Sequence, residues 1–123
     1  MSINVILTPE DMMGSDLQPG WYPLEVIKVE ELPTKAGVSN NIWFHFKIIA
    51  DGRHKNRELR RSFNEKYMNF GADLWKSLGL IGEKGGKLTD EMLYTAVGKK
   101  VRGYIKKDKE GKYDNLEQFT PLV

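Results

Sequence analysis

Apolar and polar residues alternate with a period of two along several short stretches of the chain, which is the pattern of half-buried β-strands. The clearest stretch covers residues 42–48, where one face is formed by Ile42, Phe44, Phe46 and Ile48. Residues 21–30 are also typical of a strand, but Leu24 and Val26 have the opposite parity to Ile27 and Val29. Because side chains alternate with period two, this change predicts a bulge or a sharp bend within one long strand.

Three further strands and two helices follow from the same analysis. Strands are predicted at residues 58–64, 101–106 and 112–119, the last two joined by a turn at 108–111. Residues 67–80 have the spacing of an amphipathic helix that ends at Gly79 or Gly82. Thr89 is a predicted N-cap for a second short helix within residues 88–97, closed by Gly98.

The order of three strands, a helical segment and two strands predicts the fold class. It is typical of the OB-fold, an all-β five-stranded barrel, here with the helical segment inserted between strands 3 and 4. We expect this domain to cover residues 20–123, after an irregular arm at residues 1–19. Tyr67, Phe70 and Trp75 are predicted to plug the barrel, and of the adjacent Trp21 and Tyr22 only one is expected in the core.

Composition and charge narrow the functional class. The chain of 123 residues fits one domain, and it contains no cysteine for a disulfide or a thiolate site. It lacks a stretch of about 20 apolar residues, so we expect a cytoplasmic protein without membrane contact. Of 17 acidic and 19 basic residues, residues 1–31 hold six acids and one base. The remainder therefore has an excess of seven positive charges, which favours a polyanionic partner.

Two strand faces combine aromatic and basic side chains. The predicted outer face of residues 42–48 carries Trp43, His45 and Lys47, and that of residues 101–106 carries Arg102, Tyr104 and Lys106. Single-stranded nucleic acids are bound by aromatic rings on which bases stack and by cations that follow the phosphates. Each triplet alone is also compatible with an ordinary solvated strand face. Their occurrence on both of the best alternating strands favours a nucleic-acid site.

Basic loops supplement these faces as candidate phosphate contacts. One cluster comprises Arg53, His54, Lys55, Arg57, Arg60 and Arg61, and Lys35 lies in the predicted loop at residues 33–41. A second cluster contains Lys106, Lys107, Lys109 and Lys112, but acidic residues dilute it. Parity predicts that Arg60 points outward and Arg61 inward. An inward arginine is expected only at the end of the barrel or at a local bulge, so one of these is predicted for Arg61.

No catalytic constellation is recognisable. His45 and His54 lack metal-ligand spacing and an evident carboxylate partner. The glycine-rich segment at residues 82–87 lacks the spacing and context of a phosphate-binding loop and is interpreted as a turn. We therefore expect a binding protein and not an enzyme, without metal or cofactor.

The chain also resembles a known protein family. Four segments carry the resemblance: GWYPLEVIKVEELPTKAGVSNNIWFHFKI, DGRHKNRELRRSFN, FGADLWKSLGL and VGKKVRGYIKKDKEGKYDNLEQFTPL. They are similar to the phage-encoded OB-fold single-stranded DNA-binding proteins, a family first catalogued as a domain of unknown function, over about residues 20–122.

The resemblance implies that the chain coats single-stranded DNA during phage replication, recombination or repair, without sequence preference or cofactor. The positions that match the family are Lys35, Trp43, Arg57 and the pair Gly98 and Lys99. Partners among phage or host replication and recombination proteins, and self-association, stay open. Residues 119–123 contain no acidic residue, so recruitment by an acidic tail is not expected.

Two other functions are compatible with the same pattern. A phage or bacterial adaptor protein could use Trp43 and Tyr104 as interface anchors, since aromatic residues and arginine also dominate protein interfaces. An oligosaccharide-binding barrel would use the rings but not the basic loops. The salt dependence of binding separates these classes, because only phosphate contacts release counterions.

Overall fold

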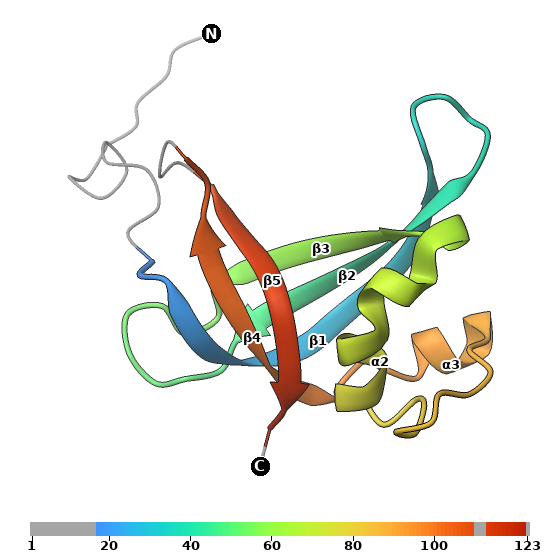
Figure 1. The fold of residues 1–123 in the computed structure, drawn as a ribbon. Helices are drawn as coiled ribbons and strands as arrows, with labels where there is room; N and C mark the ends of the chain where they lie inside the picture. The colour runs from blue at the N-terminus through green and yellow to red at the C-terminus, as the bar shows by residue number, and fades with distance from the viewer. Residues whose placement is uncertain (1–16, 110–112, 123) are drawn as a thin grey trace, which may run out of the picture.

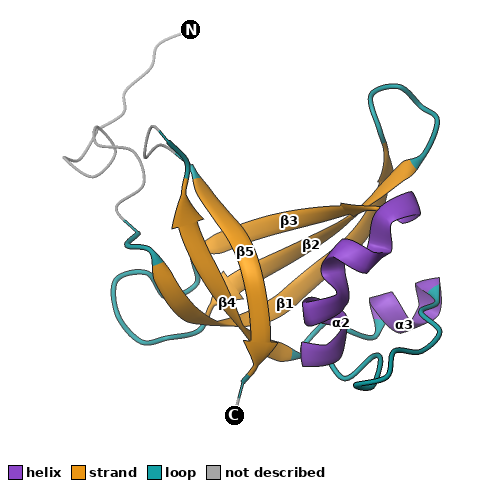
Figure 2. Cartoon of the chain, viewed as in Figure 1, coloured by secondary structure: helices purple, strands orange, loops and turns teal. Residues whose placement is uncertain are grey.

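Residues 17–109 and 113–122 are described by the computed structural model. In this part of the chain there are five strands, one 3₁₀ helix and two short α-helices (Figure 2). In chain order they are β1 (Gly20–Pro33), β2 (Asn40–Ile48), β3 (Glu58–Asn64), η1 (Glu65–Gly71), α2 (Ala72–Ser77), α3 (Asp90–Tyr94), β4 (Lys100–Lys107) and β5 (Asp114–Pro121). The predicted order of strands and the helical segment between strands 3 and 4 are thus confirmed.

The strands form one antiparallel sheet in the order β3-β2-β1-β4-β5. The long β1 pairs with β4 through Gly20 to Glu25 and with β2 through Leu24 to Pro33. Its register shifts between Val26 and Lys28, which confirms the predicted bulge. The bulge lets β1 serve both halves of the sheet, and Figure 1 shows β4 and β5 crossing in front of β1, β2 and β3.

The two edge strands of this curved sheet approach each other but share no backbone ladder in the described residues. The sheet is therefore not closed by main-chain hydrogen bonds, although a closed barrel was expected. Side chains cross the seam between β3 and β5 instead, beginning with Arg61, whose guanidinium donates to the carbonyl oxygen of Leu116. Parity correctly placed Arg61 toward the core side, but no bulge interrupts the β2–β3 pairing.

The core lies between the two halves of the sheet and consists mainly of the predicted inward faces. Its aromatic centre joins β2, β3, α2 and β5 through the rings of Phe44, Phe46, Phe63, Trp75 and Phe119. Trp75 is only 2% exposed, and its indole N–H donates to the carbonyl oxygen of Met68 at 2.8 Å. Trp75 therefore plugs the core as predicted.

The helical segment differs from the prediction in its first half. Residues 65–71 form a 3₁₀ helix, and Tyr67 interrupts its regular geometry with φ −132° and ψ 40°. A 3₁₀ turn has three residues where an α-turn has 3.6, so the predicted apolar stripe does not form. Tyr67 and Phe70 are 57% and 71% exposed, and their predicted role as part of the plug is wrong.

The remaining boundaries agree with the prediction to within a few residues. Thr89 caps α3 and accepts a hydrogen bond from the backbone N–H of Met92, but the helix ends at Tyr94. Gly79 follows α2 with φ +76°, a conformation that favours glycine at a helix end. Leu17, which the prediction placed in the irregular arm, is fully buried and packs in the core. Residues 1–16 of the predicted arm, the second half of the turn at 108–111 and the predicted strand start at Lys112 lie outside the described residues.

Helices α2 and α3 lie at one end of the sheet, and the β2–β3 loop lies at the other (Figure 1). Asp73 on α2 anchors this end, because its Oδ2 accepts the backbone N–H of Phe119 on β5 at 2.8 Å. None of the helices in the described ranges is long and apolar enough to cross a membrane.

Candidate nucleic-acid interface

Trp43, His45 and Lys47 point away from the core along β2, as predicted from parity. Across the sheet they lie, in that order, opposite Ser62, Arg60 and Glu58 on β3 and opposite Glu30, Lys28 and Glu25 on β1. These nine side chains therefore include the indole of Trp43, several cations and three carboxylates. The carboxylates from the neighbouring strands were not part of the predicted site.

Trp43 and Arg60 form the centre of this face. The guanidinium carbon of Arg60 lies 4.9 Å from the centroid of the Trp43 ring, which is within the range of a cation–π contact. Arg60 is exposed, while Trp43 is half-buried. An aromatic ring and a guanidinium are thus held together at one position on the surface. Parity predicted that each of these side chains points outward, but not that they are in contact.

A groove of about 600 Å³ begins at this pair and extends across β3 to the start of β5. It is lined by Trp43, His45, Arg57, Glu58, Leu59, Arg60, Tyr113, Asp114 and Asn115. Four of these residues were predicted site residues, namely Trp43, His45, Arg57 and Arg60. Tyr113, 69% exposed, was missed, although an aromatic residue beside a basic turn is a detectable signal.

Two carboxylates from β1 reduce the positive charge of the β2 face. Glu30 lies 2.5 Å from the ammonium of Lys28, and its Oε1 lies 3.7 Å from Nε2 of His45. The hydrogen bond from Lys28 is the main influence that lowers the pKa of Glu30 from its usual value of 4.5. Lys47 is similarly 3.7 Å from Glu25. His45 therefore has a carboxylate neighbour that only the β1–β2 register reveals.

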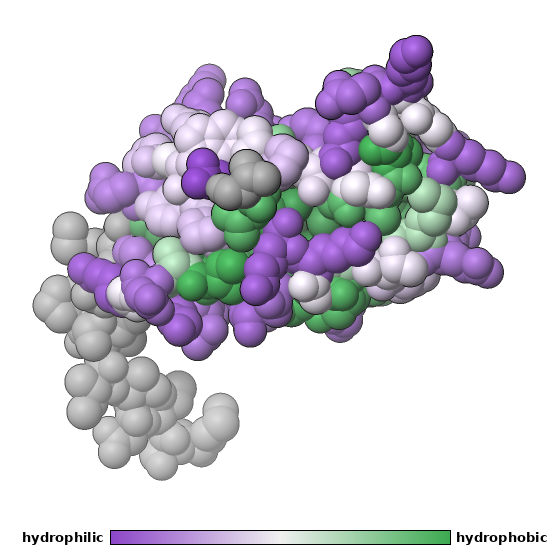
Figure 3. Space-filling model, turned by 90° about the horizontal axis from the view of Figure 1, so that it is seen from below, coloured by the Kyte–Doolittle hydropathy of each residue, from purple (hydrophilic) through white to green (hydrophobic). Residues whose placement is uncertain are grey.

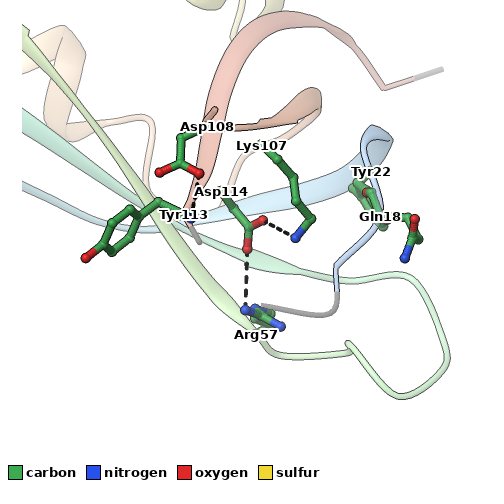
Figure 4. A network of polar contacts seen from close by, with 7 residues as sticks. All are labelled: Gln18, Tyr22, Arg57, Lys107, Asp108, Tyr113 and Asp114. Carbon is green, nitrogen blue, oxygen red and sulfur yellow. Dashed lines mark hydrogen bonds and ion pairs between the residues drawn. The ribbon is translucent and has the colours of Figure 1, made fainter. Parts of the chain in front are cut away.

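Figure 4 shows the polar contacts at the β5 wall of the groove, which reach Arg57 just before β3 and Lys107 at the end of β4. The side chain of Asp114 is only 5% exposed and lies 3.4 Å from Arg57 and 3.0 Å from Lys107. Tyr113 is fixed on the other side by its backbone N–H, which donates to Oδ1 of Asp108. Arg57 thus bridges the seam, a structural role in addition to its predicted role at the groove.

Arg102, Tyr104 and Lys106 point outward along β4, also as predicted. Tyr104 packs edge-on against Trp21 of β1, with 5.3 Å between the ring centroids. Trp21 is 44% exposed, whereas the ring of Tyr22 packs against the core. Of the adjacent pair, Tyr22 is therefore the inward residue, and Trp21 adds an aromatic ring to the β4 face that the sequence analysis left unassigned.

The other predicted contacts lie outside the groove. Lys35 is exposed in the β1–β2 loop, and Arg53 and Lys55 lie in the β2–β3 loop, where Lys55 pairs with Asp51 at 3.2 Å. The ammonium of Lys99 donates to the carbonyl oxygen of Leu78 at 3.2 Å. The backbone N–H of Gly98 donates to the carbonyl oxygen of Val26 at 2.8 Å. Gly98 and Lys99 therefore connect β4 to the rest of the fold.

Within residues 17–109 and 113–122, no group of three or more His, Asp or Glu side chains is arranged to hold a metal ion. No protein-family model matches the chain, and a comparison with curated proteins finds no significant match. The features of the molecule that bear on function are therefore the groove, its charges and its aromatic side chains.

Proposed function

We propose that the chain is a single-stranded DNA-binding protein without sequence preference, built on an OB-fold barrel whose groove holds the strand. The observation that carries this proposal is the Trp43–Arg60 pair in a surface groove bordered by Tyr113 and Arg57. The groove crosses β2 and β3 and reaches the start of β5, which is the side of an OB-fold on which oligonucleotides bind.

The chemistry of the groove suits an unpaired strand. A base can stack on the indole of Trp43, an interaction worth about 1–3 kcal/mol per base, and every base has a face that permits it. Arg60 is close enough to contact a phosphate while it remains near the ring. Bases in a duplex are stacked on one another, so duplex DNA offers no free base to Trp43.

The biological setting follows from the resemblance described above. We propose that the chain acts in phage DNA replication, recombination or repair in the cytoplasm of the host cell. Binding of this kind involves no catalytic step and no cofactor. Homo-oligomers and contacts with phage or host replication proteins are compatible with this role.

Replacement of Trp43 by alanine tests the proposal. Titration of a labelled oligo-dT, followed by anisotropy, should show W43A binding about 1–3 kcal/mol more weakly than the unmodified chain. Tyr94→Ala is the matched control, because Tyr94 is 48% exposed on α3 and lies outside the groove. Y94A should bind normally, and duplex DNA should compete poorly. Equal binding by W43A and the unmodified protein would contradict the proposal.

A second candidate function is that of a phage or bacterial adaptor, favoured by the exposed Tyr67 and Phe70 on η1, whose ring centroids are 6.2 Å apart. Aromatic residues of this kind anchor protein interfaces. On the face seen in Figure 3, apolar residues gather in several patches between hydrophilic side chains. A double variant Y67A/F70A that binds oligo-dT normally would assign this pair to something other than DNA.

A further inference from the structure

We propose that a bound single strand leaves the groove across Lys106 and continues onto Trp21 and Tyr104, which form a second stacking platform. This inference rests on the proposed function and extends it, because it defines the path of the strand and adds Trp21 as a binding residue. The path begins at Asn115, which lines the groove on β5.

The register of β4 and β5 connects the groove to this platform. Asn115 lies opposite Lys106, and both side chains are exposed on the outer face. Lys106 follows Tyr104 by two residues on β4 and therefore points to the same face of the sheet. One strand spacing and two residues along a strand add up to about 11 Å from Asn115 to Tyr104. The platform therefore begins within a short distance of the groove wall.

The platform itself contains two rings in fixed relative positions. Trp21 and Tyr104 are opposite each other in the β1–β4 ladder, and their ring planes meet at 67° with 5.3 Å between centroids. Trp21 is 44% exposed, which is unusual for a large side chain that already has a packed neighbour. An exposed indole held by a second ring offers the same kind of stacking surface as Trp43.

The charge around the platform identifies a polyanion as its occupant. Arg102 and Lys106 flank Tyr104, and both are exposed. Their cross-strand neighbours and those of Tyr104 are neutral, namely Pro23, Thr120, Asn115, Gln118 and Trp21. Asp108 lies two residues after Lys106, and Glu117 lies in the β5 bulge, but neither is a cross-strand partner of this face, whereas three carboxylates lie directly opposite the β2 triplet. The outer face of β4 therefore keeps more of its positive charge than the outer face of β2.

An oligosaccharide would use the rings but gain nothing from Arg102 and Lys106, and a protein partner would need to be acidic. A single strand that already occupies the groove supplies both bases and phosphates to the platform without a second binding partner. The consequence is a dependence on length: a strand that only fills the groove does not reach Trp21, and a longer one does.

The test compares two oligo-dT lengths, about 5 and about 15 nucleotides, which bracket the site sizes of single OB-folds. The variants are W21A and the double variant R102S/K106S. The control is K84S/K87S, which removes two exposed lysines from the turn before α3. Trp21→Phe keeps a ring at the platform and should retain most of the affinity.

We expect W21A to bind the longer oligonucleotide about 10-fold more weakly and the shorter one within twofold of the unmodified chain. R102S/K106S should reduce the slope of log K against log salt by about 1.4 for the longer oligonucleotide only. Unchanged binding of the longer oligonucleotide by both variants would overturn the inference, as would equal weakening at both lengths. Failure of the unmodified chain to bind either length would instead overturn the proposed function itself.

Discussion

Trp43 has an arginine over its ring and a carboxylate beside it on the neighbouring strand. Arg60 attracts phosphates, whereas Glu30 repels them and also neutralises Lys28, from which it is 2.5 Å away. Opposing charges of this kind leave the stacking ring to supply much of the affinity. They also mean that single charge changes on β1 should alter binding without contact between that strand and DNA.

Glu30→Gln is therefore expected to strengthen binding. Removal of this negative charge beside the groove should raise the affinity by about twofold at low salt, and by less at high salt because the charge is screened. Lys28 lowers the pKa of Glu30 below 4.5, so the carboxylate is charged at pH 7 and still at about pH 5, and the gain should occur at both. Glu83→Gln, an exposed acid in a turn, is the control. Weaker binding by E30Q in the anisotropy titration would contradict this assignment.

The seam between β3 and β5 is the element that shapes the groove. Side chains replace a backbone ladder there: Arg61 reaches the Leu116 carbonyl, and Asp114 pairs with Arg57 and Lys107. The order of the strands along the chain was predictable from alternating parity and turn residues. The seam was not, because the approach of two edge strands depends on the twist and bend of the whole sheet. For the same reason, parity identified the inward direction of Arg61 but not its partner.

Asp114→Asn should destabilise the fold. The variant leaves Arg57 and Lys107 without the charge of a carboxylate that is 95% shielded from solvent, so we expect a loss of about 1–3 kcal/mol in the free energy of unfolding. Asp51→Asn removes the carboxylate of an exposed ion pair and should cost less than about 1 kcal/mol. Urea denaturation of D114N, D51N and the unmodified chain measures both losses. If D114N were no less stable than D51N, the seam would contribute little to the stability of the fold.

Gly71 tests the packing of the helical segment against the sheet. A Cβ atom at this buried position would lie 2.5 Å from the Trp75 ring and 3.0 Å from the Phe63 ring. Overpacking of this kind costs about 1–3 kcal/mol, so G71A should lower the midpoint of thermal unfolding. Gly86→Ala, where the added carbon would meet Ile81 at an ordinary 3.6 Å, should have little effect. An unchanged midpoint for G71A would show that η1 is not seated on Trp75 as described.

At the scale of the whole molecule, the sequence predicted the order of the elements along the chain, the bulge in β1 and the helical insertion. Local patterns determine these features. The prediction of Tyr67 and Phe70 as core residues was wrong, because it assumed an α-helical period that η1 does not have. Tyr113 and Trp21 became site candidates only when strand pairing placed them beside the predicted residues.

The central claim is that the Trp43 groove holds the single strand, and an NMR titration tests its location directly. Addition of a short oligo-dT to the ¹⁵N-labelled chain should shift the indole signal of Trp43 and the backbone amides of β2, β3 and residues 113–115. Signals from α3 and from the buried indole of Trp75 should stay in place. Shifts confined to η1 and α3, or no shifts at low salt, would contradict the claim.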